Sequence, residues 1–140
     1  MRTAPIGFLP DAVSDAEVFR LGAEVAALTH GHPDGYLPAG AMAVLIRGAL
    51  RGEPWTDTVT LLMDLLGGWP ESRATSVAIA SAMQAAAAGP PSRERVKQLG
   101  EGWVGEEALA VGLYSRRRLG LDSIDRRAAL RCAVWTRGLA

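Results

Sequence analysis

The sequence contains a single cysteine, and this scarcity excludes two kinds of stabilising site. Cys132 has no partner for a disulfide within the chain, and one thiol does not make a thiolate metal site. A chain without internal disulfides is typical of a reducing compartment. We therefore expect the protein to be cytoplasmic.

The chain also lacks net charge, because 15 lysine and arginine residues balance 15 aspartate and glutamate residues. No overall positive field would therefore attract nucleic acid. The last quarter is locally basic, through Arg116, Arg117, Arg118, Arg126, Arg127, Arg131 and Arg137. Neither an aromatic–basic alternation nor a known reader motif accompanies these arginines, so we interpret them as solvated helix ends and expect no nucleic-acid partner.

Long hydrophobic runs are absent as well. The most apolar stretch, residues 74–88, is rich in alanine and is interrupted by Ser76, Ser81 and Gln84, so it is too short and too polar to span a membrane. Met1 is followed by one arginine and then by a segment broken by proline and glycine, which is not the pattern of a signal peptide. We expect no membrane association.

What the sequence does contain is helical periodicity from Ser14 onward. Ser14 and Glu17 have the spacing of a capping box, and apolar residues follow at helical intervals up to Leu28. Gly31 and Pro33 then end this first helix. Residues 1–13 contain Pro5, Gly7 and Pro10, which predict an extended or looped segment.

The second predicted helix is apolar on nearly every side. Pro38 lies near its first turn, and one face carries Ala39, Met42, Ala43, Ile46, Ala49 and Leu50. Val44 and Leu45 lie on the other side, so this helix should occupy the centre of the fold.

Four further helices follow. Thr56 is predicted to cap the third, and the alanine-rich stretch to Ala88 forms the fourth. A short polar helix runs from Ser92 to about Gly100, and the next has Glu106 and Glu107 in its first turn and residues 116–118 in its last. A final helix from about Ser123 carries Ala128, Ala129, Cys132 and Trp135. Since no strand pattern competes, we predict one all-α domain over residues 1–140, a multi-helix orthogonal bundle.

The chain's only two histidines, His30 and His32, lie between the first two predicted helices. His30-Gly31-His32-Pro33-Asp34 resembles the start of the metal motif of metallo-β-lactamase-like hydrolases, but Gly35 replaces the closing histidine and no further imidazole exists to complete such a site. A serine hydrolase is disfavoured too, because no Gly-x-Ser-x-Gly turn is present.

Three separated segments resemble the second half of the ADP-ribosylglycohydrolase family, in residues, order and spacing. They are Met1-Arg2-Thr3-Ala4-Pro5-Ile6-Gly7, Leu28-Thr29-His30-Gly31-His32-Pro33 and Gly102-Trp103-Val104-Gly105-Glu106-Glu107-Ala108-Leu109-Ala110. The resemblance extends from Met1 to about Trp135 and implies an all-α fold. It also implies a binuclear magnesium centre that hydrolyses the glycosidic bond between ADP-ribose and a protein side chain or related acceptor.

The resemblance further implies that His30 and Gly31 line the substrate cleft, where His30 would hold ribose and phosphate oxygens of ADP-ribose or of an ADP-ribosylated protein. The alternative for His30 is a buried histidine at a helix end. Trp103 would stack against the nucleotide, or else be a tryptophan of the core. We expect a structural role for His32.

The sequence departs from the family in its carboxylates. The metal ligands implied by the resemblance come from an early acidic motif, a Thr-Asp-Asp stretch and an Asp-x-Asp segment, and none of these occurs here. We therefore expect no catalytic residues, no metal ligands and no magnesium bound by this chain. We interpret it as a partial domain, truncated at both ends and inactive alone, which leaves its status as an enzyme open. The alternative is a non-catalytic helical protein-interaction module, and exposed faces of residues 39–50 would promote self-association.

Overall fold

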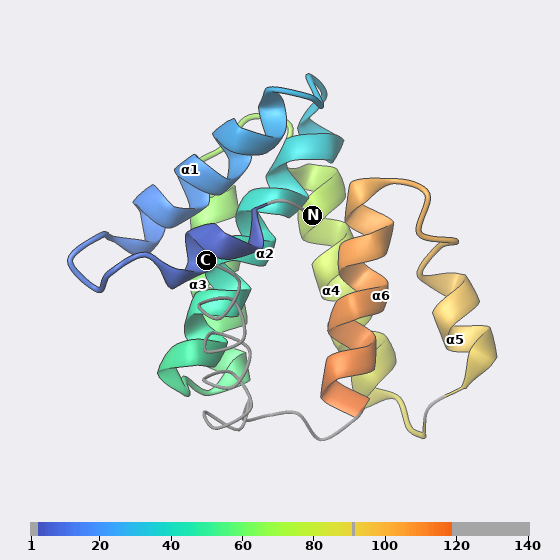
Figure 1. Cartoon of the computed structure of the whole chain (residues 1–140). Helices are drawn as coiled ribbons and strands as arrows, with labels where there is room; N and C mark the ends of the chain where they lie inside the picture. Colours follow the sequence, from blue (N-terminus) through green and yellow to red (C-terminus); the bar gives the residue numbers. More distant parts are fainter. Residues whose placement is uncertain (1–2, 91, 119–140) are drawn as a thin grey trace, which may run out of the picture.

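The computed structural model describes residues 3–90 and 92–118, and regular structure in this part is helical throughout (Figure 1). A short 3-10 helix, η1 (Ala4–Phe8), precedes the α-helices, which are α1 (Asp15–Ala27), α2 (Pro33–Arg51), α3 (Trp55–Gly67), α4 (Arg73–Ala87), α5 (Arg93–Gln98) and α6 (Gly105–Arg118). The absence of strands from these residues confirms the all-α fold class. The helix predicted from about Ser123, with Ala128, Ala129, Cys132 and Trp135, lies outside the described residues.

The start of α1 follows its local sequence signal. Ser14 is the N-cap, and its Oγ accepts a hydrogen bond from the Glu17 N–H at 3.2 Å. The other half of the capping box does not form, because the Glu17 carboxylate binds Arg20 instead. That hydrogen bond holds the pKa of Glu17 below its usual value.

Two predicted helix starts are wrong. Helix α2 begins at Pro33, with His32 as its N-cap, so it starts about one turn earlier than the start predicted near Pro38, and Pro38 lies inside the helix. Helix α3 begins at Trp55 after Pro54 and has no side-chain cap, so Thr56 does not cap it. Both sites offered several residues suited to a first turn, and the sequence alone does not rank them.

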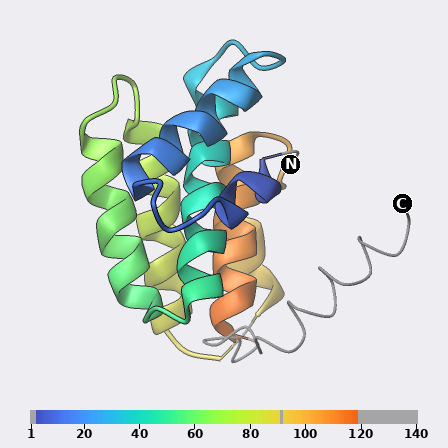
Figure 2. The same ribbon diagram turned by 60° about the vertical axis from the view of Figure 1, so that its left-hand side comes forward.

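Helix α2 is the centre of the fold, as predicted, and packs against α1, η1, α3, α4 and α6 (Figures 1 and 2). Its side chains Leu37, Ala41 and Val44 belong to the buried core. Every residue from 39 to 50 is buried or half-buried. The surrounding helices therefore cover most of residues 39–50, and the apolar surface that stays partly open on this stretch includes Met42 and Ile46.

Close contact between α1 and α2 depends on glycine. A Cβ on Gly40 would lie 2.7 Å from the carbonyl oxygen of Phe19, and one on Gly22 would lie 3.0 Å from the Cα of Gly40. Both distances are shorter than ordinary van der Waals contact. The backbones of the two helices therefore approach as closely as they do because neither glycine has a side chain.

The N-terminal segment is held by Arg47, a side chain of α2 that is only 2% exposed. Its guanidinium donates to the carbonyl oxygens of Leu9 at 2.9 Å, Pro10 at 3.1 Å and Val13 at 2.5 Å. Its Nε lies 2.8 Å from Asp15 Oδ1. The segment predicted as looped thus contains a short 3-10 helix, η1, and the residues after it are bound by the buried guanidinium of Arg47.

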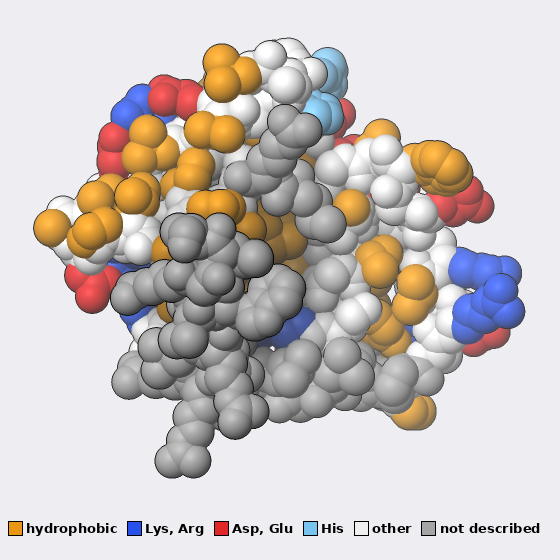
Figure 3. Space-filling model, in the orientation of Figure 1, with side chains coloured by type: hydrophobic (Ala, Val, Ile, Leu, Met, Phe, Trp, Pro, Cys, Tyr) orange, Lys and Arg blue, Asp and Glu red, His pale blue; other side chains and the backbone are white. Residues whose placement is uncertain are grey.

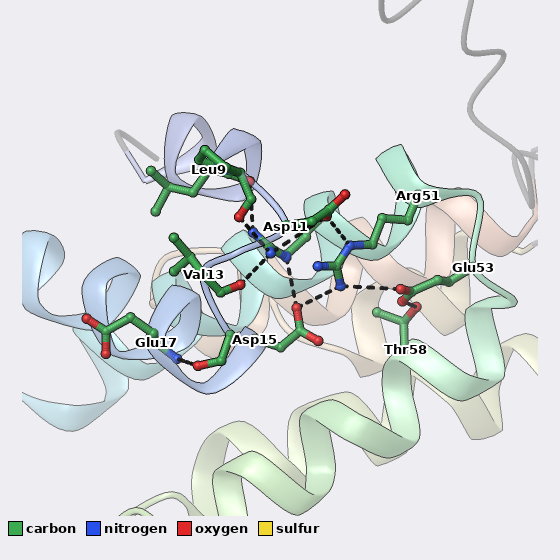
Figure 4. Close-up of polar contacts among 11 residues, drawn as sticks. Leu9, Asp11, Val13, Asp15, Glu17, Arg51, Glu53 and Thr58 are labelled. Atoms are coloured by element: carbon green, nitrogen blue, oxygen red, sulfur yellow. Dashed lines mark hydrogen bonds and ion pairs between the residues drawn. The ribbon is translucent and has the colours of Figure 1, made fainter.

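One turn further along α2, Arg51 extends this network to the carboxylates of Asp11, Asp15 and Glu53 (Figure 4). Burial alone would lower the pKa of Arg51, but the hydrogen bond to Asp11 and the charges of the carboxylates raise it. The pair of arginines therefore joins the start of α1 to the C-terminal half of α2.

Replacing Arg47 with methionine keeps the volume but removes the side-chain donor from the carbonyls of Leu9, Pro10 and Val13, and removes one of the two arginines that contact Asp15. We expect Arg47→Met to lower the free energy of unfolding by roughly 3 kcal/mol, measured by urea denaturation followed by circular dichroism. The matched control is Arg20→Met on the exposed face of α1, which should leave the denaturation midpoint nearly unchanged. Equal effects of the two substitutions would contradict this account of Arg47.

Candidate functional site

The connection between α1 and α2 presents His30 to solvent. The backbone N–H groups of Thr29 and His30 both donate to the Ala26 carbonyl, so the end of α1 is tightly wound. The Thr29 hydroxyl lies 2.8 Å from His30 Nδ1, so this contact engages Nδ1 and not Nε2. Because the His30 side chain is exposed, the alternative of a buried helix-end histidine is wrong.

Gly35, in the first turn of α2, supports His30. A Cβ on Gly35 would lie 2.8 Å from the Cβ of His30, whereas a Cβ on Gly31 would meet nothing within 4 Å. The family resemblance predicted Gly31 as a residue of the substrate cleft and did not indicate Gly35. Nothing local distinguishes these two glycines, since the contact with His30 appears only once α1 and α2 are folded back on each other.

His32 is the N-cap of α2, and its Nδ1 accepts a hydrogen bond from the Asp34 N–H at 3.3 Å. The same nitrogen lies 3.4 Å from Asp34 Oδ2, so the backbone and the side chain of Asp34 both lie close to this edge of the ring. The capping contact is the structural role that the sequence suggested for this residue.

Trp103, between α5 and α6, is 86% exposed, so the alternative of a core tryptophan is wrong. Its indole Nε1 donates to Glu101 Oε2 at 3.1 Å. A donor that is paired along one edge leaves both faces of the ring available for stacking.

Gly105 brings these two loops together. A Cβ on this first residue of α6 would lie 2.6 Å from the Asp34 carbonyl oxygen and 3.3 Å from Pro38 Cγ. Pro38 has no N–H to donate to that carbonyl, which is its position in the regular helical pattern. The start of α6 therefore packs directly on the first turn of α2, beside the histidines.

The outcome is a surface hollow of ≈ 880 Å³ at this end of the molecule. It is lined by Thr3, Val25, Ala26, Leu28, Thr29, His30, His32, Asp34, Gly35, Ala39, Gly102, Trp103, Val104, Gly105 and Ala108. All three segments singled out in the sequence thus contribute to one site. Gly31 is not among the lining residues, and Met1 and Arg2 lie outside the described part of the chain.

The lining combines exposed apolar side chains with hydrogen-bonding groups. Leu28 is 84% exposed, and it shares the hollow with Val25, Trp103 and Val104, which are exposed as well. The two histidines lie at the upper edge of the face shown in Figure 3. Such a lining suits a ligand that has a flat apolar ring joined to oxygen-rich groups.

Carboxylates are scarce at the hollow. Asp34 is the acidic residue in its lining, and no three His, Cys, Asp or Glu side chains within residues 3–90 and 92–118 are grouped so that they could hold a metal ion. A two-magnesium centre needs several converging carboxylate oxygens. The described residues therefore do not fit such a centre.

Comparison with known protein families gives one match, in which the family model described as ADP-ribosylglycohydrolase covers residues 1–137. The chain belongs to the ADP-ribosylglycohydrolase family. No curated protein and no solved structure matches it. The family assignment confirms the resemblance read from the sequence and places the chain in a hydrolase family that is generally metal-dependent and acts on ADP-ribosylated substrates.

In this ADP-ribosylglycohydrolase family member, no helix among the described residues is long and apolar enough to cross a membrane.

Replacing each of the two glycines near His30 with alanine, one at a time, tests how the imidazole ring is held. We expect Gly35→Ala to displace His30, because the new Cβ would overlap the Cβ of His30, which is fixed to the backbone and has no rotamer to escape into. Side-chain NMR signals of the histidine ring measure the change. Gly31→Ala is the matched control and should leave those signals in place, so that a large shift in the control alone would refute the assignment.

Proposed function

We propose that this chain binds ADP-ribose in the hollow between the α1–α2 connection and the start of α6, and that it does not hydrolyse the glycosidic bond by itself. The observation that carries the proposal is the convergence of the three family-like segments on one hollow. Its single cysteine agrees with a cytoplasmic location, where ADP-ribosylated proteins would be the natural partners.

The chemistry of the lining supports ADP-ribose. His30 is exposed and held by Thr29, so its Nε2 is available to a ribose hydroxyl or a phosphate oxygen. Trp103 offers an exposed aromatic face to the adenine ring. Polar recognition of the pyrophosphate and ribose together with stacking on the base would fix both ends of the ligand.

Hydrolysis would need magnesium, which supplies Lewis-acid activation of water when it is bound. Asp34 is the carboxylate that lines the hollow, and one carboxylate does not hold two hard cations. The sequence contains neither an Asp-Asp pair nor an Asp-x-Asp segment. We propose that the metal ligands would have to come from another polypeptide, and that this chain alone binds without turnover.

Isothermal titration calorimetry tests this proposal. The purified chain should bind ADP-ribose and show no measurable binding of Mg²⁺. It should also release no ADP-ribose from an ADP-ribosylated peptide. His30→Ala should weaken ADP-ribose binding about tenfold, the effect of losing one hydrogen bond to a charged group. Arg20→Met, on the exposed face of α1 and outside the lining of the hollow, is the control and should bind as the wild type does. Tight binding of Mg²⁺, or release of ADP-ribose, would contradict the proposal.

The second candidate function is a protein-interaction module that also associates with itself. It is favoured by an apolar groove of ≈ 140 Å³ between α2 and α6, lined by Met42, Leu45, Ile46, Trp55, Leu109, Gly112, Leu113 and Arg116. Covering such a groove removes apolar surface from water.

Sedimentation velocity over a range of concentrations tests the self-association. We expect the sedimentation coefficient to rise with concentration, and Met42→Glu to abolish that rise because a charge in the groove opposes burial. Val77→Glu, at an exposed apolar position of α4 outside the groove, is the control and should behave as the wild type. A wild-type chain that stays monomeric at all concentrations would exclude this second proposal.

A further inference from the structure

The loop before Trp103 is clasped by a side chain that follows it. Glu107, in the first turn of α6, accepts two backbone hydrogen bonds on one carboxylate oxygen, from the Glu101 N–H at 3.1 Å and the Gly102 N–H at 3.0 Å. A charged acceptor strengthens each of these hydrogen bonds. The carboxylate therefore fixes the backbone immediately ahead of the indole.

Two glycines allow this clasp to form. Gly100 has φ +113 and Gly102 has φ +79, in the left-handed region that other residues rarely adopt. A Cβ on Gly100 would also lie 2.7 Å from Glu107 Oε2, so a side chain there would displace the carboxylate. The sequence of this turn is thus matched to the carboxylate that closes it.

The indole itself is fixed by the same turn. Glu101, whose N–H is held by Glu107, accepts the hydrogen bond from Trp103 Nε1. The Glu107 carboxylate thus fixes the backbone at Glu101 and Gly102. The Glu101 side chain, held on that backbone, in turn orients the indole ring of Trp103. An 86% exposed tryptophan would otherwise sample several rotamers and would lose that freedom on binding.

We propose that Glu107 is a positioning residue that preorganises Trp103 as the stacking platform for the adenine ring, an inference that rests on the proposed binding of ADP-ribose. Trp103 is the one Trp, Tyr or Phe side chain that lines the hollow within the described residues, and adenine is the one aromatic ring system of ADP-ribose. The pairing of the two follows from their chemistry.

A purely structural role for Glu107 is the rival explanation, because an acidic residue in the first turn also stabilises α6 through the helix dipole. Glu106 is the matched control, since it shares that first turn and forms neither hydrogen bond to the loop. Glu107→Gln is the conservative variant, because its amide oxygen keeps an acceptor for both N–H groups.

The experiment measures binding of ADP-ribose and of ribose 5-phosphate, which lacks the base, to Trp103→Ala, Glu107→Ala, Glu107→Gln, Glu106→Ala and the double variant Trp103→Ala/Glu107→Ala. Trp103→Ala and Glu107→Ala should each weaken ADP-ribose binding about tenfold and leave ribose 5-phosphate unchanged. The double variant should be no weaker than Trp103→Ala, because Glu107 acts through the indole. Glu107→Gln should recover most of the affinity, and Glu106→Ala should bind normally.

Amide hydrogen exchange supplies a readout without ligand: the N–H groups of Glu101 and Gly102 should lose protection in Glu107→Ala and keep it in Glu106→Ala. A wild-type chain that does not bind ADP-ribose would end the proposed function and the platform with it. Normal binding by Glu107→Ala, equal weakening of both ligands, or additive losses in the double variant would overturn the positioning role alone.

Discussion

The buried guanidinium of Arg47 is the interaction on which the rest of this structure depends. The segment between η1 and α1 is irregular, so the carbonyls of Leu9, Pro10 and Val13 are not paired in a helix or sheet, although the Pro10 carbonyl also accepts a turn hydrogen bond from the Val13 N–H at 3.0 Å. A buried carbonyl without a donor costs more than a single hydrogen bond gains. Arginine carries five N–H donors in a planar fork and is always charged, so it satisfies three carbonyls and a carboxylate at once. This attachment holds the segment that follows η1 on α2. Thr3, before η1, has its own contact with α2, since its hydroxyl donates to the Ala39 carbonyl at 3.3 Å beside the hollow.

The helices themselves were largely predictable, because their signals are local. The cap at Ser14 and the acidic first turn at Glu106 act within one turn of chain and are present in the structure. The start of α2 was not predictable in this way. Pro33 and Pro38 both suit a first turn, and the packing of Gly105 on the Asp34 carbonyl, more than 70 residues away along the chain, is a tertiary contact that no local pattern encodes.

The site was predictable in membership but not in detail. Its three segments were found by their resemblance to a family, and the structure brings them to one hollow. Exposure of His30 and Trp103 could not be read from the sequence, because it is set by which helices pack behind each loop. The same reason hides Gly35, which matters through its contact with a side chain from the preceding loop. The sequence explains Glu107 as an acidic residue in the first turn of a helix. That explanation gives no indication that its carboxylate also accepts hydrogen bonds from the preceding turn.

The acidic groups around the hollow are already engaged, and this bears on what the site can do. Asp34 lies against the cap nitrogen of His32, Glu101 accepts from the indole of Trp103, and Glu107 accepts two backbone N–H groups. Recruiting Glu101 or Glu107 to a metal ion would remove a hydrogen bond that shapes the turn before α6, and a bare divalent cation also demands more oxygen ligands than three separated carboxylates supply. The carboxylates near this hollow therefore serve its geometry. Under the proposed function, this surface binds the ring and oxygen groups of ADP-ribose through preorganised contacts, while the charge needed to activate water would have to come from groups other than the described residues.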